Sequence, residues 1–360
     1  MKRSAVYLPS YVIGSDAYEQ AADVLKTYGR KAVIIGGERA MAAGAEKLEA
    51  ALQRGGISLL AREWYGGAAD PAQAERLAGL PAVREADMIL AMGGGRCADV
   101  CKVTAQRLGK PLFTFPTIAS NCAPVTALAI LYNADGVFQG NTFVKQPPVC
   151  CFIDTEIIAD APAEFLRAGI GDALSKAPEV LLALRNVPQD QNLLEGKCLA
   201  DACMEPLLRC GAAAMDAVRT HTVNEALENT VLAIIVSTGL VSNLLTCREY
   251  YYNSNLAHCF YYGATVLPVY EKYAHGEWVA YGVLALLAYD GQTELLQQVL
   301  RLNKTIGLPT CLADLEVGEA DLDALIDKAA STQGWKIRGY ETSKDRFREA
   351  ILAVDRLACR

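Results

Sequence analysis

Short apolar runs alternate with stretches of helical periodicity through the first part of the chain, up to about residue 157. Runs of this length, bounded by glycine or polar residues, are typical of β-strands. Strands separated by helices favour a parallel sheet covered by helices on both faces, and unbroken apolar strands fit a sheet buried on both sides. The predicted strands are Ala32–Ile35, Ser58–Ala61, Met88–Met92, Pro111–Thr114 and Val149–Ile153.

Two further runs predict a β-hairpin before the last strand. Ala127–Tyr132 and Gly136–Val144 flank the turn-forming segment Asn133-Ala134-Asp135. Such a pair of runs around a short polar turn indicates antiparallel pairing. We expect this hairpin to be an antiparallel addition to the sheet.

The pattern changes after Asp154, because from Pro162 onward nearly every segment has helical periodicity. Good helix formers dominate segments such as Leu193–Met204 and Glu225–Leu245. The chain therefore divides into an α/β domain with a Rossmann-like parallel sheet over residues 1–157 and an all-α domain over residues 158–360. The cleft between two such domains is the expected place for a site.

Composition narrows the class of protein. The chain has 360 residues, a net charge of −7 and no block of Lys and Arg, so we expect no nucleic-acid partner. Its longest apolar run, Val283–Tyr289, is shorter than the ~20 residues that a membrane span needs, so we expect no membrane partner. Its 12 cysteines lie mostly among apolar residues without a CxxC pair, which favours reduced thiols and a cytoplasmic protein.

A glycine triplet marks a candidate phosphate-binding loop. Gly93, Gly94 and Gly95 end an apolar strand and open a helical segment that carries Asp99 and Lys102. Glycines there let the backbone approach a diphosphate, and the free N–H groups of a helix N-terminus attract the anion. A tight strand-to-helix turn gives the same triplet. Asp99 could bind the nicotinamide amide of a cofactor, and Lys102 could steady the loop or a phosphate. Alternatively, the two residues could form a solvated ion pair.

The end of the first predicted strand bears on the choice between NAD and NADP. The strand runs into Gly36, Gly37, Glu38 and Arg39. Glu38 could accept hydrogen bonds from the ribose hydroxyls and would repel a 2′-phosphate, whereas Arg39 could contact that phosphate. We therefore expect NAD, with NADP as the alternative.

Two of the three histidines and one aspartate suggest a metal site. His258 and His275 lie in one short region with Pro268 between them, so two helices could bend and bring the rings together. Asp172 follows glycines in a segment that predicts a loop near a helix start, and it could be the carboxylate of a His–His–carboxylate set. Buried structural histidines and an ordinary helix N-cap are the alternative interpretation. His221, among polar neighbours, is expected at the surface.

These segments together resemble the iron-containing alcohol dehydrogenase superfamily, on its glycerol dehydrogenase side, whose two-domain architecture is shared with dehydroquinate synthase. The matching segments occur in the same order along the chain, from about residue 30 to residue 285. They are Gly93-Gly94-Gly95 with Asp99 and Lys102, Pro116–Ser120 with Ala123-Pro124, Gly169–Leu174, Ala257-His258, and His275-Gly276 with Val279 and Tyr281-Gly282.

The resemblance implies a role for each matching segment. Asp172, His258 and His275 would bind a divalent ion, zinc or iron. Gly94, Gly95, Thr117 and Ser120 would hold the diphosphate and the nicotinamide side of the cofactor. The nicotinamide pocket would be lined by Thr126, Leu128 and Tyr132.

Two positions depart from the family pattern. Where glycerol dehydrogenases have an aspartate that contacts the polyol, this chain has Cys122, which resembles relatives assigned as hydroxycarboxylate dehydrogenases. Where many members have a second histidine, this chain has Tyr261, a candidate for contacting substrate or relaying a proton.

The resemblance therefore predicts a metal-dependent oxidoreductase that transfers a hydride between NAD(P) and a small alcohol, polyol or 2-hydroxy acid. A homo-oligomer is expected. The alternatives are a dehydroquinate synthase-like lyase or cyclase and a non-catalytic nucleotide-binding sensor on the same fold.

Overall fold

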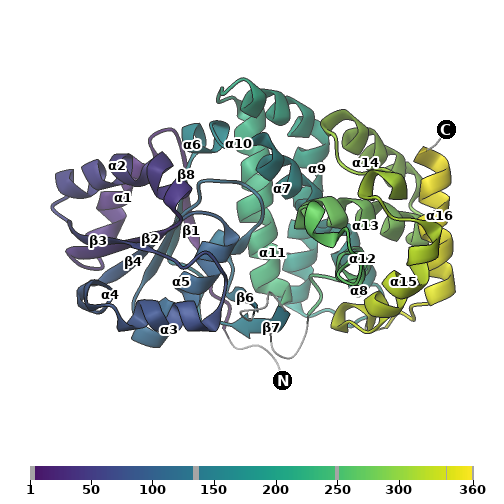
Figure 1. Ribbon diagram of the computed structural model, residues 1–360, viewed down its shortest axis with the longest axis horizontal. Coiled ribbons are helices and arrows are strands. Elements are labelled where there is room, and N and C mark those ends of the chain that lie inside the picture. The colour runs from purple at the N-terminus through teal and green to yellow at the C-terminus, as the bar shows by residue number, and fades with distance from the viewer. Residues whose placement is uncertain (1–4, 133–137, 248–250, 338, 359–360) are drawn as a thin grey trace. The chain divides into compact units, whose positions relative to one another are not determined.

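The computed structural model describes residues 5–132, 138–247, 251–337 and 339–358 (Figure 1). These residues form two compact units. Unit 1 comprises Met1–Pro162 and Ala217–Glu228, and unit 2 comprises Ala163–Asp216 and Asn229–Arg360. The segment 217–228, expected in the helical domain, thus groups with the α/β part of the chain.

Unit 1 is built on a six-stranded parallel sheet with the order β1-β8-β5-β4-β2-β3. The predicted parallel sheet is confirmed, and five of its six strands agree with the predicted runs to within a few residues. The bounds are β1 (Ser10–Gly14), β2 (Lys31–Gly36), β3 (Ser58–Trp64), β4 (Met88–Met92), β5 (Leu112–Phe115) and β8 (Cys150–Asp154).

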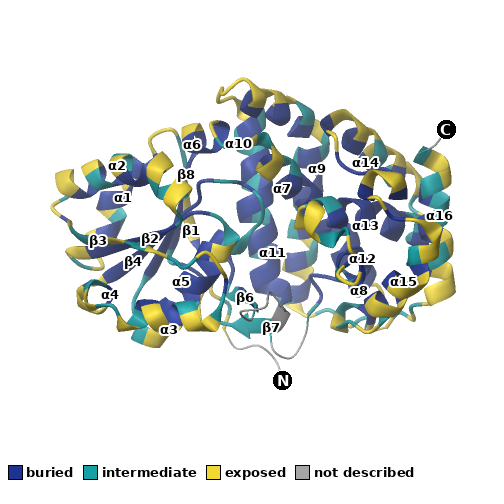
Figure 2. Cartoon of the chain, in the orientation of Figure 1, coloured by how far each residue is buried: buried dark blue, intermediate teal, exposed yellow. Residues whose placement is uncertain are grey.

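Helices cover both faces of this sheet because its central strands are buried and mostly apolar on both sides. In β2, Ile34 belongs to one buried cluster with α1 and α2, whereas Val33 and Ile35 belong to a second with α3, α4 and α5. The buried strand positions are dark blue in Figure 2, and exposed positions gather on the outer surfaces of the covering helices. The helices are α1 (Ala17–Leu25), α2 (Glu38–Arg54), α3 (Pro71–Gly79), α4 (Pro81–Glu85), α5 (Gly95–Leu108), η1 (Ala123–Val125) and α6 (Thr155–Ala159).

Two details of unit 1 differ from the sequence prediction. The edge strand β1 was not predicted; it pairs in parallel with β8, and its residues are partly exposed, so no continuous apolar run marks it. The hairpin forms from β6 (Leu128–Tyr132) and β7 (Phe138–Phe143), but as a separate two-stranded sheet, which corrects the expected addition to the main sheet. The predicted turn, Asn133–Asp135, lies outside the described residues.

Among the described residues, the regular elements of unit 2 are helices, as predicted, apart from one isolated β-bridge between Thr246 and Tyr251. The stretch predicted as one helix over Glu225–Leu245 continues through a π-helical segment, and 72% of its most apolar window is buried inside the fold. By length and composition alone that stretch could cross a membrane, but its burial is that of a core helix. The helices are α7 (Ala163–Ala173), α8 (Lys176–Ala183), α9 (Gln191–Arg219), α10 (Glu225–Val231), η2 (Leu232–Ser237), α11 (Thr238–Leu245), α12 (Leu256–Ala264), η3 (Tyr270–Lys272), α13 (His275–Asp290), α14 (Thr293–Ile306), η4 (Leu312–Leu315), η5 (Glu319–Asp321), α15 (Leu322–Ala330), η6 (Gln333–Trp335) and α16 (Lys344–Ala358).

The central helix α13 is packed so closely that backbone meets backbone. A Cβ atom on Gly276 would overlap the carbonyl group of Ala168 in α7, and one on Gly171 would overlap the carbonyl oxygen of Gly276. A Cβ on Gly282 would likewise overlap the backbone of Ala257 in α12. Glycine at these points lets α7 and α12 approach α13 more closely than any other residue would allow.

We predict that Gly276→Ala destabilises the protein by about 1–3 kcal/mol, because the added methyl group must push α7 and α13 apart. Denaturant unfolding followed by tryptophan fluorescence measures this change. Gly79→Ala is the matched control, since a Cβ there meets no atom within 4 Å. Equal unfolding midpoints for the two variants would contradict the close-packing argument.

Candidate metal centre and nucleotide-binding segments

Three side chains from three helices of unit 2 converge on one point. Asp172 lies near the end of α7, His258 in the first turn of α12, and His275 at the first position of α13. The Nε2 atoms of His258 and His275 lie 3.5 Å and 3.3 Å from the same oxygen, Oδ1 of Asp172. One ligand atom from each residue lies within 4.8 Å of the other two, a spacing that suits one metal ion. Two imidazole nitrogens and one carboxylate oxygen fit zinc or ferrous iron.

The surroundings of Asp172 correct the sequence prediction. The residue was expected in a glycine loop at a helix start, but it lies one residue before the end of α7. Gly169 and Gly171 are helical, and Gly171 is where α7 touches α13. The glycines therefore serve helix packing and do not form a loop.

The two histidines differ in exposure and partners. The side chain of His258 is 13% exposed, whereas that of His275 is 40% exposed, so the cluster is more accessible at His275. On its other side, His258 places Nδ1 2.8 Å from Oε2 of Glu179, a fully buried residue of α8. Sequence reasoning missed Glu179; the available signal was a lone acid among apolar residues of a predicted helix.

Electrostatics in this cluster favour a protonated His258 and ionised Asp172 and Glu179. Burial alone would lower the pKa of His258, but the carboxylates of Glu179 and Asp172 outweigh it and raise that pKa to about 9. Burial alone would raise the pKa of Asp172, but hydrogen bonds and charge from the two histidines bring it well below its usual range. For Glu179, burial is likewise outweighed by the charge of His258, and its pKa is lowered. Both carboxylates are therefore ionised and prepared to hold a cation.

Aromatic contacts fix the side chain of His275, and a polar contact fixes the start of α13. The ring of Tyr261 lies edge-on at 4.2 Å from the ring of His275, and the Tyr270 hydroxyl donates to the Tyr261 hydroxyl at 2.7 Å. Glu277 accepts from the backbone N–H of Ala274 at 2.8 Å, which caps α13 directly before His275. Tyr261, predicted from the departure in sequence, thus does lie beside a metal-ligand candidate.

In unit 1, the glycine triplet forms the turn from β4 into α5. Gly93 has φ +146°, a conformation that glycine adopts readily, and Gly94 precedes the first residue of α5. Cβ atoms on Gly94 and Gly95 would lie 2.7 Å and 2.8 Å from the side chains of Ile118 and Asn121. The triplet therefore packs directly against the predicted cofactor loop, in which Thr117 is buried and Ser120 is half-buried.

Asp99 and Lys102 form a buried ion pair, which corrects the solvated-pair interpretation. Their side chains are 8% and 1% exposed, and Lys102 Nζ lies 2.9 Å from Oδ1 of Asp99. The same ammonium donates to Thr126 Oγ1 at 3.0 Å and to the carbonyl oxygen of Leu128 at 2.6 Å. Oδ2 of Asp99 accepts from the N–H of Ile130 at 3.1 Å. Lys102 thus uses one donor on Asp99 of its own helix and two donors to attach α5 to the start of β6.

The remaining predicted residues have less specific surroundings. Gly37 precedes α2, and Glu38 is the first residue of that helix. Cys122 is half-buried directly before η1, and Tyr132 ends β6. His221 has a side chain that is 65% exposed and lies 3.2 Å from Asp160, so its predicted surface position is confirmed.

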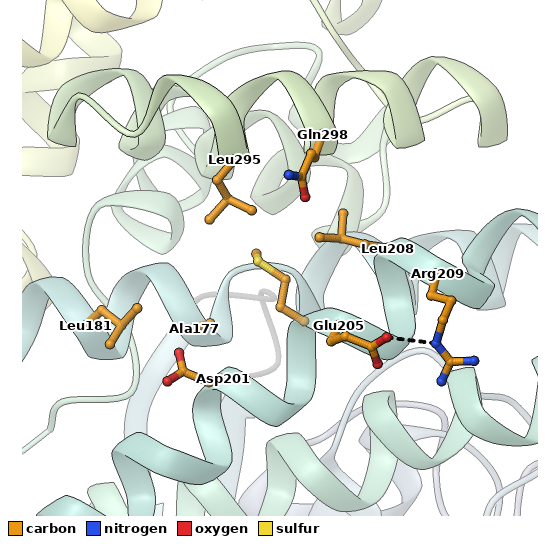
Figure 3. A pocket seen from close by; sticks show the side chains of 9 residues that line it. Ala177, Leu181, Asp201, Glu205, Leu208, Arg209, Leu295 and Gln298 are labelled. Carbon is orange, nitrogen blue, oxygen red and sulfur yellow. Dashed lines mark hydrogen bonds and ion pairs between the residues drawn. The ribbon is translucent and has the colours of Figure 1, made fainter.

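A separate pocket of about 490 Å³ lies in unit 2 between α8, α9 and α14 (Figure 3). Its floor is mostly apolar, and Glu205 and Arg209 form an exposed ion pair of 2.7 Å at its edge. None of the residues predicted for metal, cofactor or substrate lines this pocket. The lining residues are Ala177, Leu181, Asp201, Met204, Glu205, Leu208, Arg209, Leu295 and Gln298.

Comparison with known proteins agrees with this geometry. The model of the iron-containing alcohol dehydrogenase family matches residues 12–162. A glycerol dehydrogenase of Thermotoga maritima is 35% identical over 82% of this chain and 81% of its own length. Hydroxycarboxylate dehydrogenase A of Escherichia coli is 33% identical over 82% and 81%. The crystal structure of glycerol dehydrogenase from Schizosaccharomyces pombe superposes with a TM-score of 0.88 at 26% identity, covering 100% of this chain and 92% of that one.

The chain belongs to the iron-containing alcohol dehydrogenase family, in its glycerol dehydrogenase-like branch. It is accordingly an oxidoreductase that depends on a divalent metal and NAD and acts on small alcohols. The relatives do not favour the lyase and sensor alternatives.

We predict that Lys102→Met lowers the stability of unit 1 by about 3–5 kcal/mol, because it leaves the Asp99 carboxylate buried without its cation. Burial already raises the pKa of Asp99 despite the adjacent ammonium. Chemical denaturation measures the loss. Lys26→Met removes a pair of the same sequence spacing, Lys26–Asp23, whose side chains are 45% and 82% exposed, and it should change stability by less than about 1 kcal/mol. Equal losses in both variants would refute the structural role of Lys102.

Proposed function

We propose that Asp172, His258 and His275 hold the catalytic divalent ion of an NAD-dependent dehydrogenase for small polyols or 2-hydroxy acids. The observation that carries this proposal is the convergence of two Nε2 atoms on one carboxylate oxygen, from residues far apart in the sequence. Three protein ligands leave coordination positions for substrate and water, which is the pattern of a catalytic metal site.

The metal is zinc or ferrous iron, because the donor set accepts both. When bound, it supplies Lewis-acid stabilisation of negative charge on the substrate oxygen. The protein residues hold it in place: Asp172 supplies charge, and the two imidazoles supply directed lone pairs. Tyr261 keeps the His275 ring in its plane by edge-on packing and is placed to contact substrate on the more exposed side of the cluster.

The nucleotide site is assigned to unit 1. Gly93, Gly94 and Gly95 at the N-terminus of α5 bind the diphosphate, assisted by Thr117 and Ser120 of the adjoining loop. At the end of β2, Gly37 allows close approach and Glu38 accepts from the ribose hydroxyls, which favours NAD over NADP.

The nicotinamide side is assigned to the segment that contains Thr126, Leu128 and Tyr132. Asp99 and Lys102 act on this segment from inside the unit, because their polar atoms are bonded to Thr126, Leu128 and Ile130. We thus assign them as positioning residues for the cofactor pocket.

Cys122 determines which substrate class we place first. A thiol supplies no charged acceptor for a polyol hydroxyl, and the position is half-buried beside the predicted cofactor loop. We therefore rank 2-hydroxy acids and their 2-oxo partners ahead of glycerol. The relative named hydroxycarboxylate dehydrogenase A supports this order.

We also propose a cytoplasmic homo-oligomer with neither nucleic-acid nor membrane partners. The net charge of −7 argues against a nucleic-acid partner, the burial of Glu225–Leu245 against a membrane partner, and the free cysteines of the described residues favour a reducing compartment. The apolar share of 52% is compatible with a homo-oligomer.

We predict that His275→Ala removes most bound metal and lowers kcat/KM by at least about 100-fold, because two ligands hold the ion more weakly than three. Metal content and NADH absorbance are measured with glycerol, other diols, 2-hydroxy acids and 2-oxo acids, in the presence of zinc or ferrous ion. His221→Ala, at the exposed histidine, should leave both readouts unchanged. Native metal content and turnover in His275→Ala would overturn the metal assignment.

We predict that zinc binds more tightly as the pH rises, by roughly tenfold per unit between about pH 7 and pH 8.5. In the metal-free protein the pKa of His258 is about 9, so the ring is protonated over this range. Binding must release that proton, and the cost of release falls as the pH approaches 9. Competition with a chelator of known affinity measures the slope, and an affinity that does not change with pH would contradict this prediction.

A further inference from the structure

Glu179 is a buried carboxylate whose side-chain hydrogen bonds, among the described residues, go to the segment that carries one metal-ligand candidate. Its Oε1 accepts from the backbone N–H groups of Asn255 at 2.7 Å and His258 at 3.0 Å. Its Oε2 lies 2.8 Å from Nδ1 of His258. Its backbone carbonyl accepts from Asn255 Nδ2 at 2.6 Å. The residue is fully buried, and among the described residues its ion pair is with His258.

We propose that Glu179 is a positioning residue that sets the tautomer of His258 for metal binding. A neutral imidazole carries one proton, and the nitrogen without it holds the lone pair that binds a metal. A carboxylate only accepts hydrogen bonds, so Oε2 of Glu179 keeps the proton on Nδ1. The lone pair then lies on Nε2, the atom that faces Asp172. This inference rests on the proposed metal site.

The same carboxylate also fixes where the ring lies. Oε1 accepts from the N–H of Asn255, the residue before α12, and from the N–H of His258, and Oε2 lies against the ring of His258, the third residue of that helix. Backbone and ring of His258 are therefore oriented by one rigid group of α8. Such outer carboxylates generally change metal affinity by about 10- to 100-fold when they are removed.

Replacement by glutamine separates the two roles. In Glu179→Gln, the amide oxygen can still accept from the N–H groups of Asn255 and His258, so the start of α12 keeps its partners. The amide nitrogen then faces Nδ1 of His258 and donates to it. The imidazole proton moves to Nε2, and the lone pair needed for the metal is lost.

We expect Glu179→Gln to weaken zinc binding by roughly 10- to 100-fold while the thermal midpoint of the metal-free protein stays near the native value. Titration of metal-free protein against a fluorescent zinc chelator measures the affinity, so no turnover is required. Glu205→Gln, at the exposed ion pair with Arg209, is the matched control and should bind zinc as the native protein does.

A second measurement uses the native protein with ¹⁵N-labelled histidine and bound zinc. His258 should show a protonated Nδ1 whose hydrogen exchanges slowly with water, and an Nε2 shift typical of a metal-bound nitrogen. The exposed His221 serves as an internal reference for a fast-exchanging ring. This readout does not depend on whether a variant folds.

The outcomes separate the two proposals. If the native protein binds no zinc or ferrous ion, the proposed metal site fails. If the native protein binds zinc and Glu179→Gln binds it equally well, or if Nδ1 of His258 proves unprotonated in the zinc-loaded native protein, the role of Glu179 is overturned and the metal site stands. Weaker binding in Glu179→Gln with native stability supports both.

Discussion

The contact between α7 and α13 is the constraint on which the candidate metal centre depends. Gly171 and Gly276 let the two backbones touch, and any side chain there would force the helices apart. Asp172 follows one of these glycines and His275 precedes the other. The positions of Asp172 and His275 are therefore set by the packing of two backbones, which vary far less in position than long side chains do.

Buried charges take the same role in both units, since each one ties a functional segment to a rigid helix. In unit 1, Lys102 attaches α5 to the segment predicted to line the nicotinamide pocket. In unit 2, Glu179 attaches α8 to the start of α12 and to the ring of His258. Because a buried charge without a partner is costly, these networks fix their partners strictly and leave few alternative arrangements. Removing the cation of the Asp99–Lys102 pair is therefore expected to cost more stability than breaking one of the exposed ion pairs.

The family relationship and the site geometry answer different questions. Relatives named as glycerol and hydroxycarboxylate dehydrogenases establish the class of reaction. Cys122 and Tyr261 depart from the glycerol dehydrogenase pattern, and we propose that both influence which substrate is bound. Substrate choice is thus expected to differ among relatives that share one metal centre, because a few side chains can change while the helix packing is kept.

Local patterns in the sequence were enough for the strands of the parallel sheet, the helical character of the second half and the surface position of His221. They were enough because burial on both faces makes a strand apolar at every position and a 3.6-residue period marks a helix. The edge strand β1, the separate hairpin sheet and the helical position of Asp172 depended on the tertiary structure. Two of these are decided by a neighbour distant in sequence: β8 for β1, and α13 for Gly171 beside Asp172. The role of Glu179 could not be predicted for the same reason, because it depends on a contact with His258, 79 residues away along the chain.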